Sequence, residues 1–270
     1  MRIGVAGLGL IGGSLALALR ERHDIAAFDV DRATREAARA RGLTAVDDLE
    51  ALLPSDAVIV ATPMASVLPT LAALAPRADG AVLLDVSSVR GPVDALARDT
   101  TSARIVGMHP MAGRSARGFA SADPALLAGR PFLVVPTASA DSDAMAVAGG
   151  VARDAGGVVT VCSAAEHDRI VAVTSALPLA VAAALAIAGA EATPQLAAFA
   201  GPGLRDATRL ADTPVDLAEA LLLANGGNVV AAFARIRALL DELERAVAER
   251  DAAAVRATLE RAASARALLG

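Results

Sequence analysis

The sequence predicts an α/β protein: an N-terminal doubly wound, Rossmann-type parallel sheet followed by an all-helical C-terminal domain. The first reason is that short apolar runs alternate with helical spacers as far as Val161, the pattern of a parallel sheet with helices on both faces. The second reason is that long helical segments without convincing strands follow this residue. We therefore place one domain at residues 1–162 and a second at residues 163–270.

Composition limits what the chain can do. Its net charge of −5 and its scattered basic residues provide no basic surface, so nucleic-acid binding is not expected. The single cysteine, Cys162, has no partner for an internal disulfide, which fits a reducing, cytoplasmic compartment. All 25 basic residues are arginine, and the absence of Lys, Tyr and Trp excludes mechanisms that need a Tyr/Lys pair or a catalytic lysine. Proton transfer is left to His, Asp, Glu or the cysteine, and no metal site is expected.

The first element is a strand, a tight turn and a helix, because Ile3 and Val5 precede a glycine-rich turn that leads into an apolar helical pattern. Gly7 takes the sharp bend, Gly9 lets backbone N–H groups approach a pyrophosphate, and Gly12 lets the helix pack closely on the strand. The expected phosphate-binding turn consists of Gly7, Leu8, Gly9, Leu10, Ile11 and Gly12. Such a motif is weak evidence by itself, so the surrounding unit must support it.

That support comes from a second apolar run, residues 25–28, which ends at Asp29, 22 residues after Gly7. This is the separation expected of the carboxylate that accepts the ribose hydroxyls of a dinucleotide. A carboxylate here repels a 2′-phosphate and therefore favours NAD as the cofactor. The nearby Arg32 and Arg35 leave NADP as an alternative.

The remaining strands bring further polar residues to the same edge of the sheet, because ligands of such sheets bind at the carboxyl ends of the strands. We expect these strands at residues 57–61, 81–86, 104–108, 131–135 and 158–161. Three of them are followed by Thr62-Pro63, Ser87-Ser88 and His109-Pro110. We assign Thr62 and Pro63 to the cofactor site and the other two positions to the chemistry.

His109 is the candidate base, and Pro110 holds its backbone extended at the cofactor edge. An imidazole with a pKa near neutrality accepts the proton of an alcohol while the same carbon loses hydride; the alternative is a histidine that tethers the loop. Ser88 either hydrogen-bonds a substrate hydroxyl or caps a helix. We expect His167, in the first turn of a helix, to be structural and His23 to face solvent.

The C-terminal half begins with a capping box from Ser163 to Glu166. The uncharged segment 170–190 is long enough to cross a bilayer, but it is mostly alanine and contains Pro178, so we expect a helix buried on all sides and no membrane span. Further along, apolar residues spaced by fours and threes form one seam of a helix: Val229, Phe233, Ile236, Leu240, Leu243 and Val247. The seam needs a partner, and we expect a homodimer through the helical domain rather than the final helix alone.

Two arginines four residues apart, Arg205 and Arg209, follow a glycine-rich break and lie on one face of a helix. Guanidinium groups that project toward a cleft suit a dianionic carboxylate substrate, since each forms a bidentate pair. The alternative is an exposed helix on which arginine and aspartate pair with each other.

Taken together, segments 7–14, 85–90, 109–113, 166–168 and 203–209 resemble the prephenate/arogenate dehydrogenase family, in that family's order and over nearly the whole chain. The resemblance implies a dinucleotide-binding domain at residues 1–162 and a helical domain for substrate binding and dimerisation at residues 163–270. It implies NAD- or NADP-dependent oxidative decarboxylation of a small cyclohexadienyl carboxylate, prephenate or arogenate, on the route to tyrosine. His109 then takes the proton of the ring hydroxyl, which Ser88 shares. Arg209, with Arg205, holds a carboxylate.

The departures from the family lie on the substrate side. Ser175-Ala-Leu-Pro-Leu179 replaces a common Ser-His-Leu-Pro-His, which removes two polar groups, and Arg90 replaces a usual lysine. Arg114-Ser115 stand where the family frequently has a Thr-Glu pair. We expect Arg114 to compensate for the missing histidines, and we place Ser175 at the substrate as well. Two alternatives stay open: a dehydrogenase of a related cyclohexadiene such as an amino-substituted prephenate, and a non-catalytic NAD-sensing dimer.

Overall fold

The computed structural model describes residues 1–100, 102–114, 116–193 and 195–269. The chain divides into two compact units, Met1–Asn225 and Gly226–Gly270. The sheet and every candidate site residue belong to the first unit. The proposed domain boundary at residues 162/163 is a separate matter and stays a prediction.

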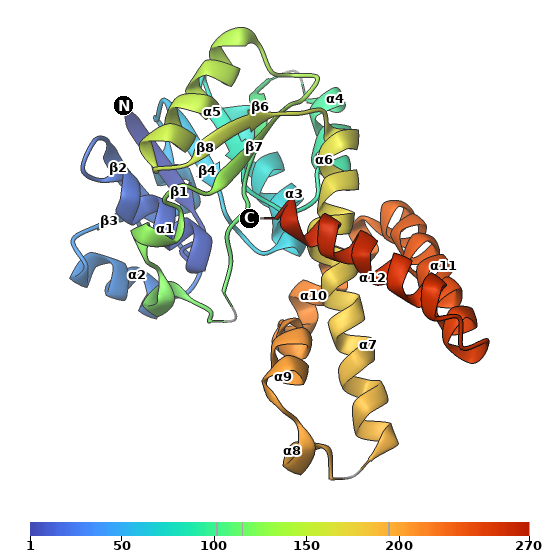
Figure 1. Cartoon of the computed structure of the whole chain (residues 1–270). Coiled ribbons are helices and arrows are strands. Elements are labelled where there is room, and N and C mark those ends of the chain that lie inside the picture. Colours follow the sequence, from blue (N-terminus) through green and yellow to red (C-terminus); the bar gives the residue numbers. More distant parts are fainter. Residues whose placement is uncertain (101, 115, 194, 270) are drawn as a thin grey trace. The chain divides into compact units, whose positions relative to one another are not determined.

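An eight-stranded sheet forms the centre of the first unit, with strand order β3-β2-β1-β4-β5-β6-β7-β8 (Figure 1). The strands are β1 Arg2–Ala6, β2 Asp24–Phe28, β3 Thr44–Ala45, β4 Ala57–Val60, β5 Val82–Asp85, β6 Arg104–Pro110, β7 Pro131–Pro136 and β8 Val158–Val161. The order reverses between β1 and β4, which creates the crevice where doubly wound sheets bind their ligands. The predicted Rossmann-type fold class is confirmed.

Two strands, β7 and β8, run against the predicted direction. Of the described strand pairs, β6 and β7 alone are antiparallel. The reason lies in their connection, residues 111–130, which contains only the short 3₁₀ turns Phe119–Ser121 and Pro124–Leu126 among its described residues. A parallel neighbour needs a crossover helix. The prediction of a wholly parallel sheet is therefore wrong for β7 and for β8, which runs parallel to β7.

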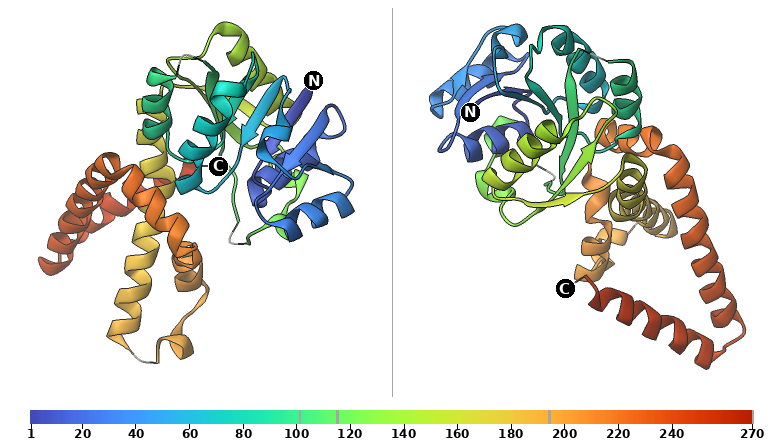
Figure 2. Two further views of the ribbon diagram at one scale, coloured as in Figure 1. Left: turned by 180° about the vertical axis from the view of Figure 1, so that it is seen from behind. Right: turned by 90° about the horizontal axis from the view of Figure 1, so that it is seen from above.

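Helices cover both faces of the sheet (Figure 2). α1 (Leu10–Leu19) and α5 (Ser142–Asp154) contribute Leu15, Leu19 and Val151 to one buried core. α3 (Met64–Leu74) and α4 (Gly91–Asp99) contribute Val67, Leu71 and Val93 to a second core on the other face. α2 (Arg32–Ala40) lies beside the edge strand β3. Because β1, β4 and β5 are buried from both sides, their carboxyl ends are held rigidly.

Helices complete the first unit: α6 Ala164–Val171, a π-helical turn Ala172–Ala176, α7 Leu177–Ala192, α8 Leu196–Phe199, α9 Pro202–Thr208 and α10 Val215–Ala224. Ser163 caps α6 by accepting a hydrogen bond from the Glu166 N–H at 3.2 Å, as the capping box predicts. Among the described residues, the helical stretch Ala164–Ala192 is long and apolar enough to cross a membrane, and 28% of its apolar 18-residue window is buried. Within the described part of α7 the buried residues are Leu179 and Ala182, so the expectation of a helix buried on all sides is wrong for the single chain.

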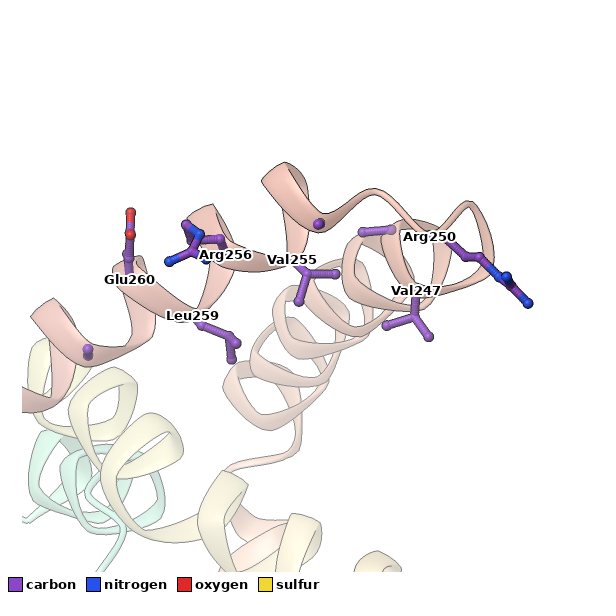
Figure 3. Close-up of a pocket in the computed structure, with 9 residues that line it drawn as sticks. Val247, Arg250, Val255, Arg256, Leu259 and Glu260 are labelled. Carbon is purple, nitrogen blue, oxygen red and sulfur yellow. The ribbon is translucent and has the colours of Figure 1, made fainter.

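The second unit consists of α11 (Gly226–Ala248) and α12 (Ala252–Ala267), joined by a tight turn. Asp251 begins α12 by accepting hydrogen bonds from the N–H groups of Ala253 and Ala254. An open groove of about 650 Å³ between the two helices is lined by Val247, the last residue of the predicted seam, together with Val255 and Leu259 (Figure 3). The final helix, α12, therefore supplies apolar residues that face the last part of the predicted seam on α11.

Candidate active site

The glycine turn has the geometry that its sequence predicts. Gly7 has a φ of +92°, and a Cβ there would lie 2.7 Å from the carbonyl oxygen of Ala61. A Cβ on Gly12 would lie 1.9 Å from the Gly7 carbonyl oxygen, so only glycine lets α1 approach β1 this closely. Gly9, by contrast, faces open space, because no described atom lies within 4 Å of the point that a Cβ would occupy, and no described side chain caps α1 there. The N-terminus of α1 is thus free to receive a phosphate.

Asp29, at the end of β2, is oriented by the glycine turn. Its Oδ2 accepts a hydrogen bond from the Leu8 N–H at 2.7 Å, and its Oδ1 accepts one from the Asp31 N–H at 2.9 Å. Each carboxylate oxygen retains a lone pair for a further donor. The position therefore fits a carboxylate that accepts ribose hydroxyls beside the phosphate site.

The two arginines near Asp29 already have carboxylate partners. Arg32 pairs with Glu36 at 2.8 Å. Arg35 pairs with Asp47 at 3.3 Å and donates to the Asp29 carbonyl oxygen at 2.7 Å. Both guanidinium groups thus have structural roles in and around α2.

Thr62 and Pro63 follow β4, across the crevice from β1. The Thr62 Oγ1 is buried and has no hydrogen-bond partner among the described residues. A buried hydroxyl without a partner is costly, and a bound ligand is one way to satisfy it. Together with the open cradle at Gly9, this orphaned hydroxyl fits a dinucleotide laid across the carboxyl ends of the strands.

Beyond the crevice, the structure brings five of the six predicted chemical and substrate residues into one cavity of about 560 Å³. These residues are Ser88, His109, Arg114, Ser175 and Arg209. Met111, Leu210, Leu217 and Leu221 supply apolar lining. Arg205 is not among the described residues that line this cavity. Its substrate role stays a prediction.

Ala176 and Leu179, which stand where the family commonly has histidines, do not lie at the substrate cavity as expected. Ala176 and Leu179 are both buried, and neither is among the described residues that line the cavity. The neighbouring Thr174 and Ser175 line it instead. In this chain, therefore, the two changes act on helix packing, and the cationic lining of the cavity comes from arginines.

His109 is the buried end of a hydrogen-bonded chain of three side chains. Its Nδ1 lies 2.9 Å from the Nε2 of His167, and the Nδ1 of His167 lies 2.8 Å from the Oδ1 of Asp168. Asp168 also accepts hydrogen bonds from the backbone N–H groups of Arg90 at 2.8 Å and Gly91 at 2.9 Å. His167 is therefore oriented on one side by a carboxylate and orients His109 on the other.

This chain assigns the protons of both imidazoles. Because the ionised Asp168 can only accept, the Nδ1 of His167 must donate to it, which leaves the Nε2 of neutral His167 as an acceptor. The Nδ1 of His109 must then donate to His167. The remaining ring nitrogen of His109, Nε2, carries a lone pair in a residue that lines the cavity. That is the arrangement of a general base.

The surroundings keep both imidazoles neutral. Burial, then the proximity of His167 and of Arg90, lower the pKa of His109 well below its ordinary value of 6.5. Burial also lowers the pKa of His167, although the hydrogen bond with Asp168 opposes this. Burial opposes ionisation of Asp168, but the bonds from His167 and from the two backbone N–H groups hold the pKa of its carboxyl below the usual value. A neutral base beside an ionised carboxylate results.

Sequence reasoning missed part of this arrangement. His167 was expected to be structural, yet it contacts the candidate base directly, and the adjacent Glu166-His-Asp168 segment was the available signal. His23 was expected to face solvent, but its side chain is only 8% exposed and lies 3.0 Å from Asp154. No group of three His, Cys, Asp or Glu side chains among the described residues is arranged to hold a metal ion.

A Rossmann-type sheet with an open glycine turn, and a neutral imidazole beside a cationic cavity, define the class of dinucleotide-dependent oxidoreductases. The family model described as "Prephenate dehydrogenase, nucleotide-binding domain" matches residues 15–161, and that described as "Prephenate dehydrogenase, dimerization domain" matches residues 163–261. The chain belongs to the prephenate dehydrogenase family.

Individual relatives agree with this membership. A prephenate dehydrogenase of Bacillus subtilis is 30% identical over 92% of this chain and 70% of its own length. The crystal structure of Synechocystis arogenate dehydrogenase has a TM-score of 0.87 at 30% identity, with 100% of both chains covered. Prephenate dehydrogenase from A. aeolicus, in complex with hydroxyphenyl propionate and NAD+, has a TM-score of 0.92 at 25% identity, covering 99% of this chain and 98% of that one.

Proposed function

We propose that the protein catalyses NAD-dependent oxidative decarboxylation of a cyclohexadienyl carboxylate, prephenate or arogenate, in tyrosine biosynthesis. The observation that carries this proposal is the proton arrangement at His109, which leaves a lone pair on its Nε2. His109 lines the same cavity as Arg114 and Arg209. A base for a hydroxyl and cations for carboxylates are what this reaction requires. The relatives include both a prephenate and an arogenate dehydrogenase, which supports the substrate class.

In the proposed reaction, the Nε2 of His109 accepts the proton of the ring hydroxyl while the carbon that bears this hydroxyl loses hydride. Ser88, at the end of β5 in the same cavity, donates a hydrogen bond to the hydroxyl oxygen. When bound, NAD supplies the hydride acceptor. The bond to the ring carboxylate then breaks, its electron pair enters the ring to make it aromatic, and CO2 leaves. The protein need supply only alignment and a base.

The cofactor half of the proposal favours NAD over NADP. Asp29 places a carboxylate beside the glycine turn, where the adenosine ribose would lie, and a 2′-phosphate would be repelled there. Of the two nearby cations, Arg35 is mostly buried and is held by Asp47 and the Asp29 carbonyl oxygen, which leaves the exposed Arg32 as the cation that could accept such a phosphate. The NAD+ complex of the A. aeolicus relative supports the same choice.

The substrate half of the proposal assigns carboxylate binding to Arg209 and Arg114, and a hydrogen bond to Ser175. Arg114 pairs with Asp123 at 2.9 Å across two partly exposed side chains, so this pair is weak enough to yield to a substrate carboxylate. Asp123 itself is anchored, because its N–H donates to the Ser14 Oγ of α1 at 2.9 Å. Arg114 can therefore exchange one carboxylate partner for another without moving the loop.

We further propose that the protein is a homodimer and acts in the cytoplasm. The match to a dimerization-domain model supports the first statement, as does the exposed apolar surface of α7, on which Leu185 and Ile187 are 40% and 59% exposed. A buried free cysteine, Cys162, is compatible with the second.

The test is NADH formation, followed by absorbance, from prephenate, arogenate and an amino-substituted prephenate side by side, each with NAD and with NADP. We expect turnover of prephenate or arogenate with NAD and much weaker turnover with NADP. Turnover of the amino-substituted compound alone would replace the proposed substrate. NAD binding without turnover of any of the three would favour the non-catalytic NAD-sensing dimer instead.

A further inference from the structure

Arg90 is a fully buried cation outside the cavity. Its side chain is 2% exposed, and its Nη1 lies 2.6 Å from the Oδ2 of Asp85 and 3.0 Å from the Asp85 carbonyl oxygen. Its Nη2 donates to the Ser87 Oγ at 2.6 Å and also to the Ser87 carbonyl oxygen. One guanidinium group thus ties the last residue of β5 to the turn that carries Ser88.

The backbone of the same residue holds the histidine chain. The Arg90 N–H donates to Asp168 Oδ1, and the next N–H, of Gly91, donates to Oδ2. Asp168 in turn orients His167, which orients His109. The guanidinium group of Arg90 therefore holds the turn that carries Ser88, and its backbone N–H holds the hydrogen-bonded chain that ends at His109.

β6 provides further evidence that the position of the guanidinium is closely defined. A Cβ on Gly107, two residues before His109, would lie 2.6 Å from the Arg90 Nη1. Only glycine at this point of β6 leaves room for the guanidinium against the strand. A lysine, the usual residue of the family here, carries a single ammonium and lacks the planar fork that bridges two acceptors.

We propose that Arg90 is a positioning residue: its guanidinium locks the turn from Asp85 to Gly91, so that Ser88 and the Nε2 of His109 face the same substrate hydroxyl. The inference rests on the proposed function, because Ser88 and His109 are the reacting pair only there. The inference goes beyond the proposed function, because it makes the alignment of Ser88 and His109 depend on an arginine outside the cavity.

The same residue acts on the charge state of the base. Arg90 is one of the causes, after burial and His167, that lower the pKa of His109. The other charged or titratable groups around His109 are Asp168, which is bonded to His167 on α6, Asp85 at the end of β5, and Arg114 and Arg209 in the cavity. Removal of the Arg90 charge should raise the pKa of His109 and move the acidic limb of the activity profile to higher pH.

The test compares Arg90→Met, which removes fork and charge, with Arg90→Lys, which keeps the charge and removes the fork. Arg98→Met is the matched control, because Arg98 lies on α4, the helix that Arg90 precedes as its N-cap, but is 65% exposed and pairs only with the nearby Asp94 among described residues. The chain has only three histidines, so ring ¹⁵N spectra of histidine-labelled full-length protein resolve the tautomer of each.

In the wild type and in Arg98→Met we expect a single His109 tautomer with the proton on Nδ1. In both Arg90 variants we expect a mixture of tautomers. With NAD and the active substrate, kcat should fall roughly 10-fold in Arg90→Lys and roughly 100-fold in Arg90→Met, while NAD affinity changes less than about twofold. Only Arg90→Met should shift the acidic limb upward.

A purely structural arginine would give another result. Both Arg90 variants would then unfold at lower temperature yet keep the wild-type tautomer, kcat and pH profile in the folded state, and that result overturns the proposal. If Arg90→Met does not fold, Arg90→Lys decides by the same spectra. The spectra need no turnover, so a failure of the proposed reaction is distinguishable from a failure of this inference.

Discussion

The two sides of the cavity are built differently. On the side of the base, His109, His167, Asp168 and Arg90 are buried, and each is fixed by hydrogen bonds to its neighbours. On the substrate side, Arg114 and Arg209 are exposed. Buried groups held by several hydrogen bonds keep their geometry, whereas exposed ion pairs contribute little energy and exchange partners readily. Under the proposed function, the reaction would depend on the core of the protein, and recognition of the substrate on its surface.

The largest effect should come from the base itself. His109→Asn removes the proton acceptor, so we expect kcat to fall roughly 10³- to 10⁴-fold, because general-base catalysis is lost. NAD affinity, measured by calorimetry, should stay within about twofold, since His109 lies outside the glycine turn. Retained turnover in this variant would show that the buried side does not perform the chemistry.

A smaller loss of kcat should follow when the hydrogen bond between Asp168 and His167 is reversed in direction. Asp168→Asn presents an amide, which can donate to His167 and thereby invert the donor and acceptor roles along the chain to His109. We expect kcat to fall roughly 10²- to 10³-fold with little change in KM, as when an orienting carboxylate is lost next to a catalytic imidazole. Asp94→Asn is the control, because the carboxylate of Asp94 pairs with the exposed Arg98 on α4. Equal rates for the two variants would mean that His167 only fills space.

The substrate side should respond in KM. Arg209→Met removes a carboxylate partner, and we expect KM to rise about tenfold with kcat nearly unchanged, the cost of one charge-assisted hydrogen-bonding contact. Arg114→Met should behave in the same way, and Arg205→Met tells whether the earlier arginine contributes. Arg98→Met controls for the loss of charge. A fall in kcat without a change in KM in Arg209→Met would contradict the assignment of substrate binding to the exposed side of the cavity.

The mildest effect is on pH dependence. Because the pKa of His109 is lowered below 6.5, the base becomes protonated only at more acidic pH. We expect kcat/KM to be flat from about pH 6.5 to 8 and to fall only as the pH drops further, since a protonated imidazole accepts no proton. Initial rates across this range measure it. If the acidic fall in kcat/KM were centred above pH 6.5, that would contradict the buried, neutral state of His109.

Local sequence information was sufficient for the glycine turn and for the place of His109 at a strand end, because both follow from residues close together in the chain. It was insufficient for the contact between His109 and His167, which joins two segments 58 residues apart. The direction of β7 was also missed, because an apolar run looks the same in either orientation and only its irregular connection distinguishes them. Likewise, the sequence does not show that Ala176 and Leu179 are packed away from the cavity.

The antiparallel return of β7 has a consequence for how such a protein diverges. Arg114 lies in the connection between β6 and β7, a surface segment attached to α1 through Ser14, whereas His109 lies within β6 itself. Under the proposed function, mutations or length changes in that connection would alter which substrate is bound and leave the strand that carries His109 unchanged. A lineage can therefore acquire a new substrate preference by loop drift alone, while inheriting its hydride chemistry unaltered.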